Sequence, residues 1–263
     1  MAVIEPESGQ AQEHEPQRPM LVPCQRLPLA APLTWLRLGW RDLRRAPRLT
    51  MIFGLVIVLV SALISALAWQ LGRFALLATV LSGFVFVAPL IAVGLYCVSR
   101  ALEQQRRPTL RESFVLARRV MGQAAVFALA QGVIILLWSR AGMVLNALFP
   151  PNTTEIAALI EFFAIGSAVG AVFAGITFAV AVFSLPMIAD RDVDMVTAGI
   201  SSVNAVLRNK LPMLLWAGLI LLLTVLGFAT ALLGLGIVMP WLAYSAWHGY
   251  RHTMDASAWP ELP

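Results

Sequence analysis

Long apolar blocks alternate with short arginine-rich stretches along most of the 263-residue sequence. A helix needs about 20 mostly apolar residues to cross the hydrocarbon core of a bilayer, which is roughly 30 Å thick. Measured against that length, the apolar blocks predict six transmembrane helices, at about residues 50–70, 74–98, 122–149, 157–187, 212–229 and 231–250. The pattern is therefore typical of an all-α fold, a polytopic membrane helix bundle.

Polar residues, prolines and length separate the predicted spans from one another. Residues 70–73 include a glutamine and an arginine and separate the first two spans, and Pro150 and Pro151 separate the third from the fourth. Residues 211–247 carry no charged side chain but are too long for one crossing, so we divide them near Thr230. The spans are thus expected to form three hairpins.

The sequence contains an approximate threefold internal repeat. Each even-numbered span carries a proline and a similar tripeptide, Leu-Ile-Ala after Pro89, Met-Ile-Ala after Pro186 and Trp-Leu-Ala after Pro240. A short segment with helical amphipathicity precedes each odd-numbered span, at residues 33–48, 107–121 and 196–208. We interpret the unit as an amphipathic helix plus a transmembrane hairpin, so that three direct repeats surround an axis along the membrane normal.

The amphipathic segments place apolar positions opposite polar ones. In the first segment, the apolar stripe of Leu33, Leu36, Trp40 and Leu43 lies opposite a row of arginines. We expect these helices at the cytoplasmic interface, with their arginines on anionic lipid head groups, each contributing about 1 kcal/mol. The alternative is that they are ordinary loop helices packed on the bundle. The first predicted partner is therefore a lipid bilayer with anionic head groups.

Composition excludes a soluble enzyme, and the charges orient the chain. Apolar residues make up 59% of the sequence and charged residues 13%, well below the charged share of a typical soluble domain. Of the 19 Lys and Arg residues, all except Arg73 and Arg140 fall on one side of the predicted topology. Because basic loops stay cytoplasmic, both termini are predicted to be cytoplasmic. The preference for Arg over Lys and the abundance of Ala favour a bacterial source, and hence the bacterial inner membrane.

The two ends of the chain differ from the membrane domain, which is predicted over residues 33–252. Residues 1–32 contain six prolines and four glutamates without an apolar run, which predicts a disordered cytoplasmic N-terminal tail. Residues 253–263 are predicted to be a short cytoplasmic tail. Cys24 and Cys97 have no second Cys or His at metal-ligand spacing, so no cofactor is expected.

Asp190, Asp192 and Asp194 form the densest acidic cluster, at the point where the fourth predicted span leaves the membrane. Carboxylates at this spacing suit a divalent cation such as Mg²⁺ or Ca²⁺. The Gly and Glu that an EF-hand loop requires do not follow at the right positions. The interpretation we favour is that Asp192 or Asp194 caps the following amphipathic helix while the others pair with arginines.

His248 and His252 are neighbours at i and i+4 near the cytoplasmic end of the sixth predicted span, and this spacing places both on one helix face. Two histidines alone do not complete a metal site. Because Trp247, Tyr250 and Arg251 surround them, we favour an interfacial belt of aromatic and basic side chains.

Arg140 and Glu161 are opposite charges in the third and fourth predicted spans that could face one another. Ionisable residues inside a membrane are costly and point to function by default. Both residues lie near the outer ends of their helices, where long side chains reach water easily. We therefore favour a structural ion pair or solvent exposure over a substrate or proton site.

Three segments carry a resemblance to a known family: residues 39–47 (GWRDLRRAP), 184–194 (SLPMIADRDVD) and 240–251 (PWLAYSAWHGYR). Over about residues 25–252 the chain resembles a proteobacterial family of integral membrane proteins of unknown function, some members of which are labelled cytochrome c oxidase subunits. The resemblance implies an inner-membrane location and assigns no catalytic residue. A haem-copper catalytic subunit needs several histidines within its spans, and the predicted hydrocarbon core contains none. An accessory or assembly role in an oxidase stays open.

Three functions from different classes remain. The first is a non-enzymatic scaffold, assembly or accessory subunit with a membrane protein partner, because no buried nucleophile, acid–base pair or metal cluster is evident. The second is a transporter or channel, because proline-interrupted helices often line midplane sites, although only Gln131, Thr177 and Thr224 are mildly polar there. The third, ranked lowest, is a membrane enzyme that uses the aspartates and histidines at the cytoplasmic face. No nucleic-acid partner is expected.

Overall fold

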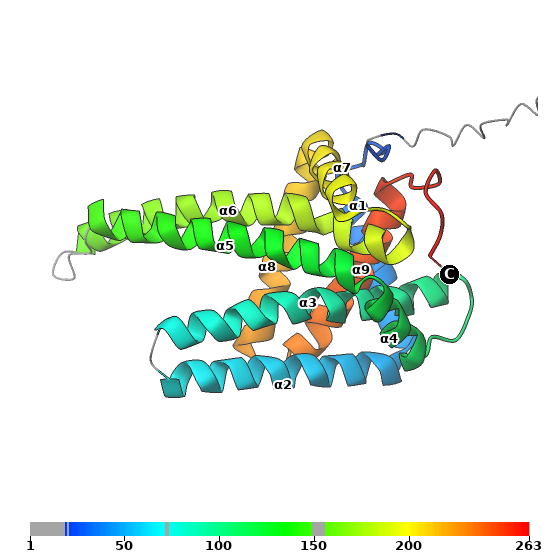
Figure 1. The fold of residues 1–263 in the computed structure, drawn as a ribbon, viewed down its shortest axis with the longest axis horizontal. Helices are drawn as coiled ribbons and strands as arrows, with labels where there is room; N and C mark the ends of the chain where they lie inside the picture. Colours follow the sequence, from blue (N-terminus) through cyan, green and yellow to red (C-terminus); the bar gives the residue numbers. More distant parts are fainter. Residues whose placement is uncertain (1–18, 20, 72–73, 149–155, 263) are drawn as a thin grey trace, which may run out of the picture.

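The computed structural model describes residues 19, 21–71, 74–148 and 156–262 and folds most of them into helices (Figure 1). In chain order the helices are α1 (Ala31–Arg45), α2 (Pro47–Leu71), α3 (Phe74–Glu103), α4 (Leu110–Arg119), α5 (Met121–Leu148), α6 (Ile156–Asp190), α7 (Met195–Arg208), α8 (Lys210–Ala229) and α9 (Leu235–Thr253). The predicted turns at Arg73 and at residues 150–151 lie outside the described residues, as do residues 1–18 of the predicted N-terminal tail.

Four of the described helices are long and apolar enough to cross a membrane. They are α2 over Pro47–Leu67, α5, α6 and α8. These helices coincide with four of the predicted spans, and the all-helical fold class is confirmed. The two further spans, which would lie in α3 and α9, stay a prediction.

A tight turn separates α8 from α9, and α9 therefore does not start where the last span was predicted to start. Ala231 and Leu232 adopt positive φ angles of 52° and 72°, and the Thr230 hydroxyl accepts the Gly234 amide at 2.7 Å. As a result α9 begins and ends a few residues later than the predicted range of 231–250. Hydropathy located the break but not the helix start, because the residues on both sides of the turn are apolar.

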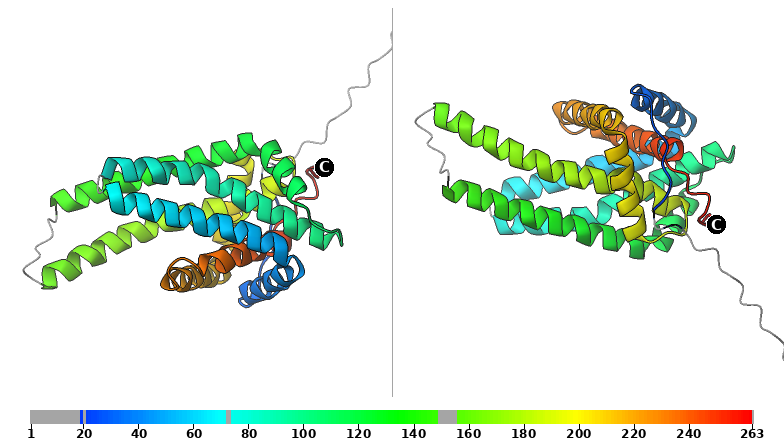
Figure 2. Two further views of the ribbon diagram at one scale, coloured as in Figure 1. Left: turned by 90° about the horizontal axis from the view of Figure 1, so that it is seen from below. Right: turned by 90° about the horizontal axis from the view of Figure 1, so that it is seen from above.

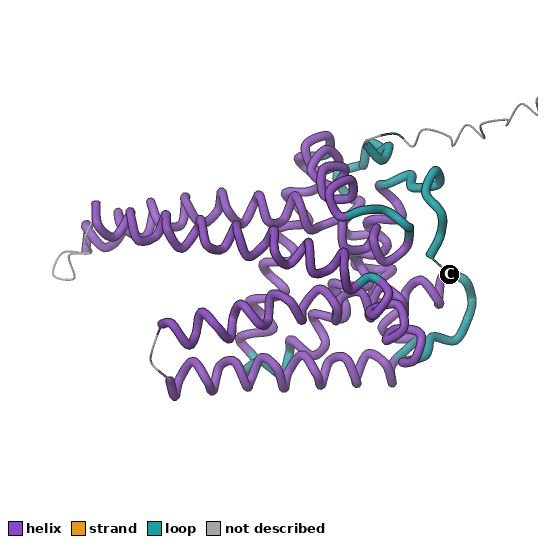
Figure 3. Tube along the Cα trace, in the orientation of Figure 1, coloured by secondary structure: helices purple, strands orange, loops and turns teal. Residues whose placement is uncertain are grey.

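The helix α9 lies at the centre of the molecule and contacts α1, α2, α3, α6 and α8. The hairpins α2–α3 and α5–α6 project in the same direction, away from the end where α1, α4, α7 and the C-terminus gather (Figures 1 and 2). Most of the loop segments also lie there (Figure 3). We call this end, made of α1, α4, α7 and residues 254–262, the polar end.

The predicted amphipathic segments form α1, α4 and α7, each directly before an apolar helix. On α1 the buried positions include Trp35, Gly39 and Asp42. In contrast, Leu33 and Trp40 of the predicted apolar stripe are 53% and 41% exposed. Leu33 is therefore accessible to lipid, whereas Leu36 of the same stripe is buried and Trp40 packs edge-on against Trp241 of α9.

Close approach of the helices to α9 depends on glycine. A Cβ atom on Gly54 of α2 would collide with the Gly236 carbonyl oxygen of α9. A Cβ atom on Gly39 of α1 would collide with the Ser245 hydroxyl and lie 2.7 Å from its backbone nitrogen. Hydropathy alone cannot identify such positions, because glycine contributes little to it.

The buried aromatic core lies near the polar end. Trp35 makes T-shaped contacts with Phe183 and Trp216, with ring centroids 6.4 Å and 5.6 Å apart. The outer parts of α5 and α6 differ, since Leu148 and Ile156 are 69% and 76% exposed. Exposed apolar surface of this extent is suited to lipid contact and not to water.

Some described residues within the predicted tails, residues 1–32 and 253–263, pack against the rest of the described chain. Val22 is fully buried, and its amide donates to Ser201 Oγ at 3.0 Å. Trp259 near the C-terminus is only 4% exposed. Among the described residues of these segments, backbone hydrogen bonds join Gln25 to Thr253 and Asp255 to Pro23, so paired backbone groups accompany the buried apolar side chains.

Candidate functional site

Asp190, the first residue of the predicted acidic cluster, is a buried carboxylate at the C-terminal end of α6. Its Oδ2 accepts hydrogen bonds from Tyr250 Oη at 2.9 Å and from Arg191 Nε at 3.2 Å. Arg251 Nη1 lies 3.4 Å from the same oxygen, and Arg100 Nε lies 3.6 Å from Oδ1. One carboxylate thus ties α3, α6 and α9 together. We call these five residues the Asp190 network.

Glu103 of α3 extends the Asp190 network. Trp247 Nε1 donates to Glu103 Oε2 at 3.0 Å, and Arg251 Nε donates to Oε1 at 3.3 Å. Arg251 Nη1 also lies 3.4 Å from Asp190 Oδ2. Arg251 therefore bridges two carboxylates.

The C-terminal segment closes over the Asp190 network. The Leu262 amide donates to the backbone carbonyl of Asp190 at 2.9 Å. Arg191 Nη1 donates to the Trp259 carbonyl at 3.0 Å, and Nη2 donates to Glu261 Oε1 at 3.1 Å. Arg191 therefore joins the end of α6 to residues 259–261 of the predicted short C-terminal tail.

A second buried carboxylate, Asp42 of α1, was missing from the predicted site residues. Its Oδ2 accepts the Ser99 hydroxyl at 3.0 Å and lies 2.7 Å from His248 Nε2. Asp42 is 2% exposed, and its contacts join α1, α3 and α9. The sequence pattern could have identified Asp42 as a buried residue, because the spacing of Trp35, Gly39 and Asp42 places the three residues on one face of the helix.

The two predicted histidines contact different residues of α1. His248 pairs with Asp42, and His252 Nδ1 accepts the indole N–H of Trp35 at 3.2 Å. Among the described residues, no group of three or more Cys, His, Asp or Glu side chains is placed to hold a metal ion. The histidines instead join α9 to α1.

The other two aspartates of the acidic cluster lie apart from the Asp190 network. Asp194 caps α7, and its carboxylate accepts the Thr197 amide at 2.8 Å, as the favoured interpretation predicted. The Asp192 side chain is exposed. The three aspartates therefore have separate environments: one ties helices together, one caps a helix and one faces outward.

Arg140 and Glu161 lie on the outer parts of α5 and α6, and both side chains are exposed. The two alternatives of an ion pair and of exposure to water, which long side chains near helix ends reach easily, both stay predictions. The structure does not bring these two residues together with the aspartates and histidines of the polar end (Figure 1).

Replacing Asp194 by alanine should lower stability by about 1 kcal/mol at neutral pH, because α7 loses its N-cap. Burial alone would raise the pKa of Asp194, but hydrogen bonds from Thr197 and the Val196 amide outweigh it and lower the pKa below its ordinary value of 3.8. The charged carboxylate therefore stabilises the folded state above that value, and this contribution is lost as the pH falls through the lowered pKa. Thermal unfolding in detergent should show a deficit at about pH 7 that shrinks at about pH 2.5.

The control for this experiment is Asp192→Ala, which removes an exposed carboxylate from the same loop. It should leave the melting temperature nearly unchanged at both pH values. A loss equal to that of Asp194→Ala would contradict the capping role and indicate a general charge effect.

The membrane-length apolar helices and the polar end define the class of this chain: it is an integral membrane protein with several apolar helices. Residues 76–190, which cover most of α3 and all of α4, α5 and α6, match the model of a family described as "Predicted integral membrane protein (DUF2189)". The chain is similar to that family over less than half of its length, and the similarity supports the membrane-protein resemblance drawn from the sequence. Comparisons with curated proteins and with solved structures found no match.

Proposed function

We propose that this chain is a non-catalytic protein of the bacterial inner membrane, a scaffold, assembly or accessory subunit of an envelope or respiratory complex. The observation that carries the proposal is that the buried polar side chains form hydrogen bonds and ion pairs between helices. Asp190 joins α3, α6 and α9, and Asp42 joins α1, α3 and α9. A catalytic site needs an acid, base or nucleophile within reach of a substrate, whereas these carboxylates are buried among structural donors.

The proposal includes six transmembrane helices with both termini in the cytoplasm. The helices α1 and α4 carry basic residues in their last turns and lie at the polar end with residues 254–262 (Figure 1). Arg140 lies on the outer part of α5, away from that end. Under the positive-inside rule this distribution supports a cytoplasmic polar end.

The order of elements supports the proposed threefold repeat. Among the described helices, a short helix, an apolar helix and a proline-containing helix follow one another three times. The prolines are Pro89 in α3, Pro186 in α6 and Pro240 in α9. Each proline removes a backbone donor inside its helix, in the middle of α3, near the end of α6 and in the first half of α9.

A transporter or channel is supported less well. A cavity of about 340 Å³ is lined by residues of α2, α3, α6, α8 and α9. Its walls are mostly apolar, with Thr224 and Tyr96 as the hydroxyl-bearing residues. An ion pathway needs oxygen ligands or charged groups along its length, so this lining favours hydrophobic contents over a hydrated ion.

The α5–α6 hairpin offers a large exposed apolar surface for a membrane partner. It reaches farther from the polar end than the α2–α3 hairpin (Figures 1 and 2). Leu136 and Phe163 on this hairpin are 67% and 64% exposed. Because this part of the hairpin packs mainly on itself, it is the surface on which we expect the partner subunit.

Purification of the tagged full chain in a mild detergent should recover a second membrane protein in stoichiometric amount. A photo-crosslinking residue at Leu136 should attach to that same protein, because the position is exposed on α5. The same residue at Ala128, which is fully buried, is the control and should give no such product. A clean homo-oligomer without a partner would contradict the proposal.

The proposed orientation predicts opposite labelling of the outer end of α5 and of the loop between α3 and α4 at the polar end. In a Cys24→Ser and Cys97→Ser background, Asn146→Cys should react with a membrane-impermeant maleimide added to intact spheroplasts. Gln104→Cys, on the loop before α4, should react only after the membrane is opened. Both positions are exposed, so a difference in labelling reports sidedness and not burial. The reverse pattern would overturn the orientation.

A further inference from the structure

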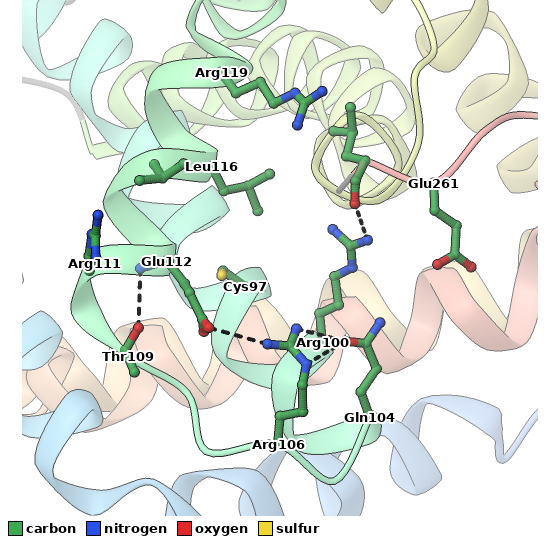
Figure 4. A pocket seen from close by; sticks show the side chains of 12 residues that line it. Cys97, Arg100, Gln104, Arg106, Thr109, Arg111, Glu112, Leu116, Arg119 and Glu261 are labelled. Atoms are coloured by element: carbon green, nitrogen blue, oxygen red, sulfur yellow. Dashed lines mark hydrogen bonds and ion pairs between the residues drawn. The ribbon is translucent and has the colours of Figure 1, made fainter.

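A cavity of about 820 Å³ opens at the polar end between the C-terminal end of α3, the loop after it, α4 and the C-terminal segment (Figure 4). Its volume is within the range of about 300–1,000 Å³ that is usual for small-molecule sites. Arginines from three segments line it: Arg100, Arg106, Arg111 and Arg119. We call this space the arginine cavity.

The lining of the arginine cavity carries an excess of positive charge. Against its four arginines stand two carboxylates, Glu112 and Glu261, a formal excess of two positive charges. Glu112 is paired with Arg106 at 3.2 Å, and Glu261 is paired with Arg191 at 3.1 Å. Each carboxylate is thus paired with an arginine, which offsets part of its negative charge.

The donors around the arginine cavity are already oriented. Arg106 Nε and Nη2 donate to Gln104 Oε1 at 3.1 Å and 2.7 Å, and Nη1 donates to Glu112. Arg100 donates to the Leu262 carbonyl, which fixes its side chain on the wall. Figure 4 shows Arg100, Arg106 and Arg119 around one open space. Preorganised donors lose less entropy when a ligand binds.

The start of α4 also lines the cavity. Thr109 Oγ1 accepts the Glu112 amide at 3.2 Å and thereby caps the helix at the cavity wall. The ten-residue helix that begins here also presents the positive end of its dipole. Val115 and Leu116 on the same helix supply apolar wall for the rest of a ligand.

We propose that the arginine cavity is a binding site for a phosphate-bearing ligand. The planar guanidinium fork matches the geometry of phosphate oxygens and forms the stronger, charge-assisted hydrogen bonds. The phosphate can belong to a free phosphorylated small molecule or to the monoester head group of a lipid at the cytoplasmic interface. This site goes beyond the proposed scaffold function, which requires no ligand.

The test is isothermal titration of the full chain in a neutral detergent at about 0.15 M salt, with inorganic pyrophosphate and, separately, with dioctanoyl phosphatidic acid. The double variant Arg106→Gln and Arg111→Gln should weaken binding by about tenfold or more, since each arginine supplies hydrogen bonds to a charged group. Arg106 and its partner Glu112 are 54% and 41% exposed, so the variant should keep the melting temperature of the free protein.

The matched control is Arg37→Gln and Arg41→Gln, which removes the same charge from the surface of α1. At about 0.15 M salt the screening length is about 8 Å, so this control should bind pyrophosphate as the wild type does. For phosphatidic acid it should lose only the smaller contribution of exposed arginines at the membrane interface. Binding of pyrophosphate assigns the site to free phosphorylated ligands, and binding of phosphatidic acid alone assigns it to a lipid head group. The proposal is overturned if neither probe binds, or if both double variants lose affinity equally.

Discussion

Asp190→Asn should lower the free energy of unfolding by about 3 kcal/mol or more, the usual cost of breaking a buried ion pair from one side. The amide keeps the shape of the side chain but removes the negative charge near Arg100, Arg191 and Arg251. Arg100 and Arg191 are only 13% and 11% exposed, so they would stay charged with little water around them. Thermal unfolding of the detergent-purified chain should show a fall of about 6–12 °C.

Two comparisons separate the ion-pair effect from a general charge effect. Asp192→Asn changes an exposed carboxylate two positions away and should shift the melting temperature little. Combining Asp190→Asn with Arg100→Gln should cost less than the two single changes together, because one unpaired charge is removed. Strict additivity, or an equal shift in Asp192→Asn, would show that the Asp190 network does not hold α3 and α6 together.

Gly54→Ala should destabilise the bundle by about 1–3 kcal/mol, because the added Cβ overpacks the crossing of α2 and α9. The atom that it meets is the Gly236 carbonyl oxygen, and backbone cannot rotate aside as a flexible side chain can. The two helices must therefore separate along their contact. The loss should be measurable as a lower melting temperature even though alanine favours helix over glycine by about 1 kcal/mol.

Gly218→Ala on α8 is the matched control, since nothing lies within 4 Å of a Cβ at that position. It makes the same chemical change in an apolar helix and should leave the melting temperature unchanged or slightly higher. If Gly54→Ala and Gly218→Ala shift stability in the same direction by the same amount, close approach at Gly54 does not control stability.

Hydropathy alone located most of the helices, because a run of about 20 apolar residues is a local property that bilayer thickness selects. The predicted spans in α2, α5, α6 and α8 agree with helices of membrane length. Amphipathic periodicity likewise located α1, α4 and α7. The start of α9 was predicted too early, because residues 230–234 are as apolar as the helices that they separate.

The candidate site could be predicted only in part. Asp190, His248 and His252 were candidates because they lie at the ends of predicted spans. The helix after the acidic cluster predicted a cap at Asp192 or Asp194, and the structure shows that it is Asp194. The hydrogen-bond partners of these residues could not be predicted from the sequence, because Asp42 is 206 residues from His248 and Tyr250 is 60 residues from Asp190. Such pairs depend on which helix faces meet, and periodicity within one helix does not contain that information.

The amino-acid sequence by itself determined the membrane class, the spans of membrane length and the uneven distribution of arginines, because each depends on local composition. Only the tertiary structure decided that α9 lies at the centre, that the ends of the described chain fold onto the polar end and that arginines from three segments surround one cavity. The physical reason is that packing joins residues far apart in the chain. A buried carboxylate or a close glycine contact acquires its role only from the helix that lies opposite.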